Sequence, residues 1–154
     1  MSAIDDRLTS LGIVLPEPVA PIANYVPFVR TGNLVHISGQ VSLAADGGIT
    51  GTVGVDVDLE TARRAARQCG LNLLAQMKRA CDGDLSRVRR VVKLGGFVQA
   101  GPDFIDIPQV INGCSDLMVE VFGDAGRHAR SAVGVYKLPR NFAVEVDAVV
   151  EVDA

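Results

Sequence analysis

Apolar and polar residues alternate along two early runs of the chain, YVPFV and NLVHISGQVSL, between Tyr25 and Leu43. The letters RTGN separate the two runs, which predicts two short strands joined by a tight turn. From Asp58 the apolar spacing changes from about two residues to about 3.6, which predicts a helix that Asp58 caps and that runs to about Cys81. The expected buried stripe of this helix comprises Leu59, Ala62, Ala66, Cys69, Leu73, Leu74 and Met77.

A further strand and a second helix follow. The letters RVRRVVKLGGFVQA predict a strand, which Gly95 and Gly96 are expected to bend or bulge. Asp106 is the expected cap of the second helix, Pro108 fits its first turn, and Gly123 closes it. The expected stripe of this helix comprises Val110, Ile111, Cys114, Leu117, Met118, Val121 and Phe122.

Two strands are expected at the end of the chain, and turn residues Pro139 and Asn141 in KLPRN separate them as in a hairpin. The last strand is strictly alternating, so one face is apolar and the other carries Glu145, Asp147 and Glu151. The apolar face is expected against a packed layer and comprises Val144, Val146, Ala148, Val150 and Val152.

The N-terminal part is predicted to be a short helix from Ser2 to about Gly12, followed by an extended lead-in with the prolines of LPEPVAPIANY. After the paired strands, AADGGITG predicts a turn and GTVGVDV a brief strand.

The element order is strands, helix, strand, helix, strands, which favours an α+β fold with two long helices on one face of a mixed sheet. A chain of 154 residues suits a single domain, 1–154, in which residues 1–24 are the short helix and proline-rich lead-in. The second face of the sheet stays half-apolar, with Leu34 and Val133 among its residues. A closed cyclic oligomer is the common way to cover such a face.

Charge and cysteine content narrow the functions. The net charge is -3 and no aromatic residues interleave with the arginines of TARRAARQ and SRVRRVVK, so no nucleic-acid partner is expected. No apolar run has the length of a membrane span or a signal core, so no membrane partner is expected. Cys69, Cys81 and Cys114 have no CxxC spacing, and neither His36 nor His128 stands at a ligand spacing from them. Free thiols in a reduced cytoplasm, without a metal site, are therefore expected.

Arg130 opens the run RSAVGV among small and apolar residues. A guanidinium stays charged and offers a planar fork of donors, so a buried arginine needs a carboxylate or a phosphate. One interpretation is a structural ion pair with Glu145 or Asp147 across the expected hairpin. The other is a clamp for the carboxylate of a small ligand, because a bidentate arginine–carboxylate pair supplies orientation as well as binding energy.

Four short motifs occur in the chain in this order: SGQ at 38–40, ARSAV at 129–133, LP at 138–139 and VEVDAVV at 144–150. From about Tyr25 to the C-terminus the chain resembles the Rid family of reactive intermediate deaminases, also called YjgF or L-PSP proteins, as a divergent branch. The resemblance implies a chorismate-mutase-like fold, a homotrimer and three clefts between subunits. It further implies hydrolysis of enamine and imine intermediates of amino acids to 2-keto acids and ammonia, like a 2-iminobutanoate/2-iminopropanoate deaminase, with no metal or organic cofactor.

The resemblance also implies roles for individual residues. Arg130 matches the family arginine that binds the substrate carboxylate, and Glu145 matches the glutamate that positions the attacking water; these are the expected catalytic residues. Tyr25, Ser38 and Gly39 match substrate-binding positions. Such a carboxylate base contributes on the order of 10²–10⁴ in rate, and holding the substrate by its carboxylate adds a proximity effect.

Several positions depart from the family pattern. Ala132 stands where the archetypal deaminases usually have a cysteine two residues beyond the arginine. The family asparagine of the second helix matches either Asn112 or Ser115, both of which stay candidates for substrate binding. His128 is expected as a solvent-exposed loop residue, with a position over the cleft as the alternative. His36, inside a strand, is expected to be structural.

Two other functions remain open beside imine hydrolysis. One is a non-catalytic trimeric binding protein for small carboxylate metabolites such as imino or keto acids, which would keep the arginine clamp without turnover. The other is RNA cleavage or inhibition of translation, labels that some relatives carry, and the acidic balance of the chain counts against it.

Overall fold

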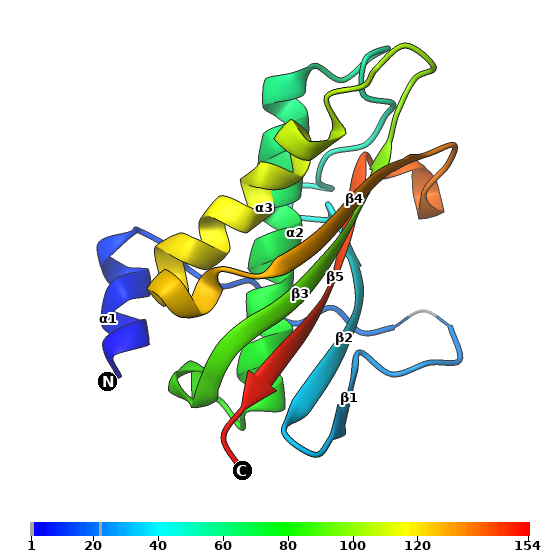
Figure 1. The fold of residues 1–154 in the computed structure, drawn as a ribbon. Helices are drawn as coiled ribbons and strands as arrows, with labels where there is room; N and C mark the ends of the chain where they lie inside the picture. The colour runs from blue at the N-terminus through cyan, green and yellow to red at the C-terminus, as the bar shows by residue number, and fades with distance from the viewer. Residues whose placement is uncertain (1, 22) are drawn as a thin grey trace.

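The computed structural model describes residues 2–21 and 23–154 and contains one five-stranded mixed sheet with two long helices on one face (Figure 1). This confirms the α+β fold predicted from the sequence. The helices are α1 (Ala3–Ser10), α2 (Leu59–Ala80) and α3 (Ile107–Phe122). The strands are β1 (Phe28–Thr31), β2 (Leu34–Val41), β3 (Val88–Gln99), β4 (Ala129–Val135) and β5 (Val144–Val152). Three 3-10 turns connect them: η1 (Leu85–Arg87), η2 (Gly123–Gly126) and η3 (Pro139–Asn141).

The ends of the long helices follow the local sequence. The Asp58 side chain accepts a hydrogen bond of 2.8 Å from the backbone N–H of Thr61, and α2 ends at Cys81 as predicted. Asp106 takes the N-cap position of α3 without a side-chain cap bond, and Pro108 fits the first turn, where a backbone N–H has no partner within the helix. Gly123 ends α3 with a φ of 62°, in the region that favours glycine.

The strand order is β1-β2-β5-β3-β4, with β5 antiparallel to β2 and β3 and with β4 parallel to β3 at the edge. The expected hairpin between the last two strands is therefore wrong, since β3 lies between β4 and β5. It follows that Arg130 forms no ion pair with Glu145 or Asp147 across such a hairpin. The alternation along β5 determines which face is buried but not which strands are its neighbours, and in the structure β2 and β3 hydrogen-bond to its two edges.

Two smaller predictions also differ from the structure. GTVGVDV contains only isolated bridges at Val53 and Val57 rather than a strand. The register of β3 shifts before Lys93, whereas Gly95 and Gly96 pair regularly. These glycines instead give space to neighbours, since a Cβ on Gly96 would lie 2.7 Å from the side chain of Ile111.

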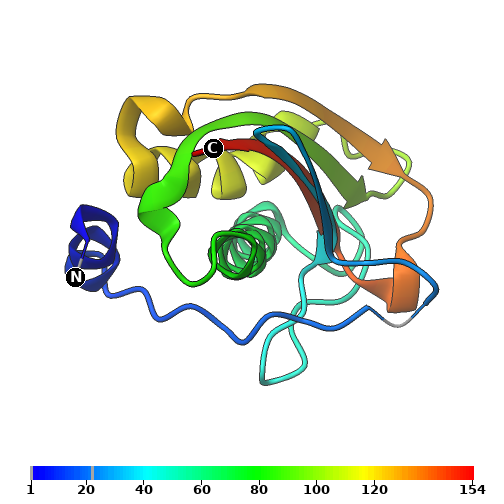
Figure 2. The ribbon, with the colours of Figure 1, turned by 90° about the horizontal axis from the view of Figure 1, so that it is seen from below.

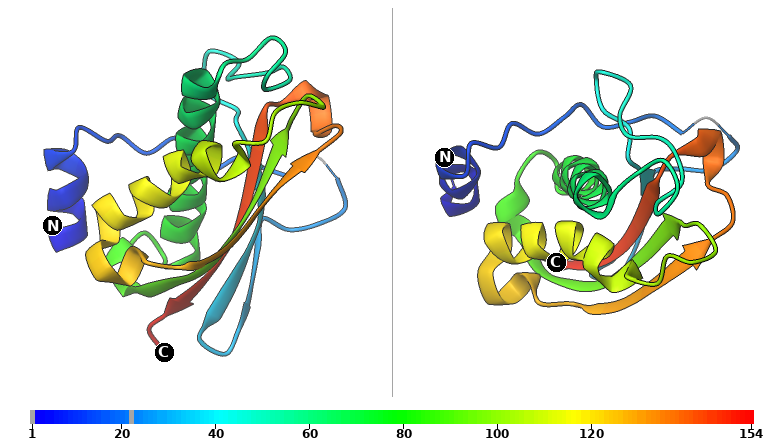
Figure 3. Two further views of the ribbon diagram at one scale, coloured as in Figure 1. Left: turned by 45° about the horizontal axis from the view of Figure 1, so that its top comes forward. Right: turned by 90° about the horizontal axis from the view of Figure 1, so that it is seen from above.

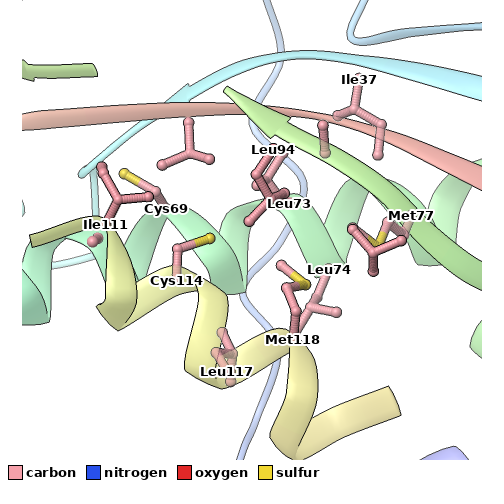
Figure 4. Packing of buried hydrophobic residues seen from close by; sticks show 14 of the residues in the cluster. Ile37, Cys69, Leu73, Leu74, Met77, Leu94, Ile111, Cys114, Leu117 and Met118 are labelled. Atoms are coloured by element: carbon pink, nitrogen blue, oxygen red, sulfur yellow. The ribbon is translucent and has the colours of Figure 1, made fainter. Parts of the chain in front are cut away.

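The core lies between the concave face of the sheet and α2 and α3. The sheet curves around α2, which Figure 2 shows end-on. The predicted apolar face of β5 is buried, and side chains of both helices meet it in one cluster (Figure 4). The three cysteines are free and buried, and burial raises the pKa of Cys114 to about 12, which keeps the thiol protonated. None of the helices in the described residues is long and apolar enough to cross a membrane.

No helix of the described residues covers the other face of the sheet (Figure 2). Val29, Leu34 and Val133 on this open face are 54%, 37% and 47% exposed. Their exposure agrees with the half-apolar second face predicted from the sequence. The lead-in from α1 to β1 runs along α2 on the side away from α3 (Figure 3).

Candidate functional site

Arg130 lies at the start of the edge strand β4, in register with the buried Leu94 of β3. Its side chain therefore points to the helical face, where Nη1 donates hydrogen bonds of 2.8 Å to Oδ1 of Asn112 and 3.1 Å to Oγ of Ser115. Both α3 residues that the sequence left as alternatives thus contact the arginine. They are three residues apart and share one helix face.

Among the described residues, no acidic side chain lies within 4.0 Å of Arg130. The half-buried guanidinium is held by two neutral oxygens and keeps further N–H groups for another acceptor. An arginine arranged in this way is suited to bind an anion, and a planar carboxylate matches its fork.

His128 completes the Arg130 cluster. Its Nδ1 lies 2.6 Å from the carbonyl oxygen of Gly126 and its Nε2 lies 2.8 Å from Oγ of Ser115. Since a carbonyl only accepts, Nδ1–H donates to Gly126 and, in the neutral ring, Nε2 accepts from the Ser115 hydroxyl. Burial lowers the pKa of His128 and the nearby Arg130 charge lowers it further, against the opposing effect of the Gly126 hydrogen bond.

The expectation of a solvent-exposed loop histidine at position 128 is therefore wrong, because the ring is half-buried against α3. The sequence contained one signal that could have corrected it. His128 directly precedes β4 and is two residues from Arg130, so both side chains leave the chain in the same direction at the strand entrance.

Glu145 lies on β5 in register with Phe97, three residues beyond Leu94 on β3, and so points to the open face. Burial raises the pKa of this half-buried carboxyl, and the neighbouring Asp147 raises it further. A Cβ on Gly39 would stand 2.5 Å from Oε2 of Glu145. The missing Cβ of Gly39 therefore leaves space for the Glu145 carboxylate. The family resemblance had implied that Gly39 contacts the substrate.

Tyr25, Gly39 and Glu145 line one cavity of about 310 Å³. Tyr25 is 49% exposed. The Ser38 hydroxyl donates a hydrogen bond of 2.7 Å to the carbonyl oxygen of Val26, and the Ser38 N–H donates one of 2.9 Å to that of Pro27. Ser38 thus positions the segment that carries Tyr25, and its hydroxyl proton is already engaged.

The structure gathers the expected site residues into two groups. Arg130, Asn112 and Ser115 stand on the helical face, whereas Glu145, Gly39 and their neighbours belong to the open face or its rim. One chain does not bring the two groups together. In residues 2–21 and 23–154 there is also no group of three or more His, Cys, Asp or Glu side chains that could hold a metal ion.

Comparisons with known proteins cover nearly the whole chain. Residues 5–151 match the family model described as "YjgF/chorismate_mutase-like, putative endoribonuclease". Protein TCP17 of Trypanosoma cruzi is 49% identical over 149 residues, which cover 96% of this chain and 92% of that protein. A crystal structure of Atu1372 from Agrobacterium tumefaciens, described as of unknown function, has 51% sequence identity and a TM-score of 0.91. The match to Atu1372 covers 97% of this chain and 92% of that one.

A more distant relative carries a named activity. The 2-iminobutanoate/2-iminopropanoate deaminase of Dermatophagoides farinae is 30% identical over 140 residues, which cover 90% of this chain and 91% of that protein. The sequence similarity to this deaminase agrees with the family resemblance inferred from the SGQ, ARSAV, LP and VEVDAVV motifs. The family match, the fold and these relatives give the same result: the chain belongs to the YjgF family, also called the Rid family, as a member of a divergent branch.

Proposed function

We propose that this protein hydrolyses reactive imines and enamines of amino acids to 2-keto acids and ammonia. The observation that carries the proposal is the half-buried Arg130, held by Asn112 and Ser115 and without an acidic partner within 4.0 Å among the described residues. The named activity of the Dermatophagoides farinae relative supports the same reaction. We place the reaction in the cytoplasm, where buried free thiols such as Cys69 stay reduced.

The chemistry divides between two side chains. Arg130 binds the carboxylate of the 2-imino acid and fixes the imine carbon for attack. Glu145 accepts one proton from water as the water oxygen forms a bond to the iminium carbon, which gives a neutral carbinolamine. Glu145 then delivers this proton to the nitrogen. As the C–N bond breaks and ammonia leaves, the hydroxyl proton of the carbinolamine passes to the Glu145 carboxylate and the oxygen becomes the keto group; that last proton is released to solvent, where it protonates ammonia. An iminium carbon is already electrophilic, so these residues supply orientation and proton transfer.

The proposal requires a second copy of the chain. Arg130 and Glu145 point to opposite faces of the sheet, and β3 separates their strands. A cleft between subunits can join Arg130 of one copy to Glu145 and Tyr25 of the next. A closed ring then gives every subunit both roles, and we propose the homotrimer that the family resemblance implies. The exposed apolar residues of the open face, including Val29 and Val133, support burial in such a ring.

The test generates 2-imino acids in situ with an amino-acid oxidase and catalase, and follows release of the keto acid. We expect the wild type to accelerate release and both Arg130→Ala and Glu145→Gln to lower the rate by at least about 100-fold. Arg127→Ala is the matched control, because Arg127 is a neighbouring arginine whose side chain is 71% exposed. Sedimentation should give the mass of three chains.

An unaccelerated wild type would overturn the catalytic proposal. If 2-keto acids then still bound in an Arg130-dependent manner, the protein would be a carboxylate-binding member of the family. Cleavage of RNA that survived Arg130→Ala would assign the site to a different chemistry altogether.

A further inference from the structure

The cavity that contains Glu145 continues beyond the residues needed for hydrolysis. It follows the part of β2 that β1 leaves unpaired, since their pairing stops at Ile37. The lead-in forms one wall, and the segment from η3 to the start of β5 forms another. Its apolar lining includes Val19, Pro21, Val41, Leu43, Pro139 and Phe142.

The walls of this cavity are fixed by hydrogen bonds from the interior. The Gln76 side chain donates a bond of 2.9 Å to the carbonyl oxygen of Val19, which holds the lead-in against α2. The Asn72 side chain donates bonds of 3.0 Å to the carbonyl oxygens of both Val41 and Leu43. Because these amide donors bind the backbone carbonyl oxygens of the walls, the lining is mainly apolar and is built before any ligand enters.

A wall on the β5 side is equally constrained. Gln99 is fully buried, and its Oε1 accepts a hydrogen bond of 2.7 Å from the backbone N–H of Leu138, directly before η3. Its Nε2 donates one of 2.6 Å to Oδ1 of Asn141. The turn between these two residues is thereby held next to Phe142, whose side chain is 7% exposed.

We propose that this cavity binds the side chain of the substrate and that the protein prefers 2-imino acids with branched or aromatic apolar side chains. The inference rests on the proposed function, because Glu145 in the lining of the cavity sets where the imine carbon must lie. A substituent on that carbon then has the apolar lining within reach. A volume of about 310 Å³ leaves room for far more than the methyl group of the smallest substrate.

The test compares imines made from alanine, leucine, phenylalanine and glutamate. We expect kcat/KM for the leucine and phenylalanine imines to exceed that of the alanine imine by at least about tenfold, since each buried methylene favours binding by about fourfold. An equal or higher value for the alanine imine would overturn the inference. So would a glutamate imine that is the fastest of the four, which would instead assign the cavity to an anion beside Arg140.

Two variants fill the cavity from two different segments of its lining. Ala20→Phe adds a ring from the exposed lead-in, and Leu43→Phe adds one from the end of β2. Both should lower kcat/KM for the leucine and phenylalanine imines by about tenfold more than they lower it for the alanine imine. Ala45→Phe is the control, because Ala45 is exposed and lies outside the cavity. Parallel losses for all substrates would contradict a side-chain pocket.

A binding measurement separates this inference from the proposed function. Calorimetric titration with 4-methyl-2-oxopentanoate and pyruvate needs no turnover. If no imine is hydrolysed, the proposed function fails, yet about tenfold tighter binding of the branched keto acid, lost in Leu43→Phe, would still support the cavity assignment. Equal affinity for the two keto acids would overturn it.

Discussion

Oγ of Ser115 lies 2.8 Å from Nε2 of His128 and 3.1 Å from Nη1 of Arg130, so one hydroxyl joins the histidine to the arginine. The hydroxyl donates one hydrogen bond to the neutral ring and accepts one from the guanidinium. The direction of each hydrogen bond is therefore fixed. Gly126 determines this arrangement, because its carbonyl oxygen keeps the proton of the ring on Nδ1. The orientation of Arg130 thus depends on His128, which among the described residues acts on the guanidinium through the Ser115 hydroxyl rather than through a hydrogen bond of its own.

We predict that His128→Ala weakens substrate binding while leaving the chemical step intact. Without the ring, the Ser115 hydroxyl is free to rotate and Arg130 loses one of its two oriented contacts. Loss of one such hydrogen bond corresponds to a rise in KM of about three- to tenfold, with kcat within about twofold. Ser115→Ala should have the same effect, and the double variant should be no worse than either. A lower kcat at unchanged KM would contradict this positioning role.

The same contacts predict how His128 titrates. Since burial and the Arg130 charge both lower its pKa, the ring should titrate below 6.5 in an NMR titration, and Arg130→Gln should move the midpoint upward. The unfolded chain binds the proton more readily, so this group makes the free energy of unfolding decrease as the pH falls below 6.5. His128→Gln should remove that part of the pH dependence. A midpoint at or above 6.5 would show that the ring is not buried as described.

The sequence alone predicted the two long helices, the five strands and the side chains that face the core. Asp58 and Gly123 are local signals of helix ends, and the alternation of Val144 to Val152 places the core face of β5 without any knowledge of its partners. Strand order was not accessible in this way. Which strands pair depends on contacts between distant segments, and the short turn at KLPRN suggested a hairpin where the chain crosses from an edge to the centre.

The consequence of that error is clearest at the site. The expected hairpin would have put Arg130 and Glu145 on adjacent strands. Their register with Leu94 and Phe97 instead places the two side chains on opposite faces of the sheet. Sequence motifs identified Arg130 and Glu145 as candidates for a carboxylate-binding site, whereas their assignment to faces of the sheet needed the strand order. The role of Gly39 was likewise hidden, because its contact with Glu145 joins β2 to β5 across the bulge in β2.

We predict that Gly113→Ala destabilises the fold. A Cβ on Gly113 of α3 would collide with the backbone carbonyl of Arg63 in α2, and backbone cannot move aside as a side chain can. The expected loss in the free energy of unfolding is about 1–3 kcal/mol in a denaturant titration. Gly134→Ala is the control, since its Cβ would meet side-chain atoms, the end of Ile107 at 3.3 Å and Cβ of Ala100 at 3.5 Å, and no backbone. Equal stabilities would disprove a close contact between the helices.

A second glycine tests the site without testing the fold. Gly39→Ala places a Cβ 2.5 Å from Oε2 of Glu145, the far end of a flexible side chain, so the carboxylate should turn away while the backbone stays in place. We expect kcat to fall by about 10- to 100-fold, because a displacement of about 1 Å at a reacting group has effects of that size. The melting temperature should stay within a few degrees of the wild type. Full activity in Gly39→Ala would separate Glu145 from catalysis.

The pH dependence of turnover follows from the surroundings of Glu145. A carboxylic acid must be ionised to accept the proton of water, and burial, with a further contribution from Asp147, raises the pKa of Glu145 above 4.5. The acid limb of kcat/KM should therefore lie above pH 4.5. Asp147→Asn removes the neighbouring negative charge and should move this limb to lower pH, although burial keeps the pKa of Glu145 raised.

A matched variant tells a specific effect of Asp147 from a general change in charge. Glu151→Gln removes one negative charge from the same face of β5, further along the strand, and should leave the acid limb in place. The raised pKa also means that the ionised Glu145 side chain lowers the free energy of unfolding at pH 7. Glu145→Gln should therefore melt no earlier than the wild type at pH 7, although it should abolish turnover. An acid limb that does not respond to Asp147→Asn would assign the limiting proton transfer to a group other than Glu145.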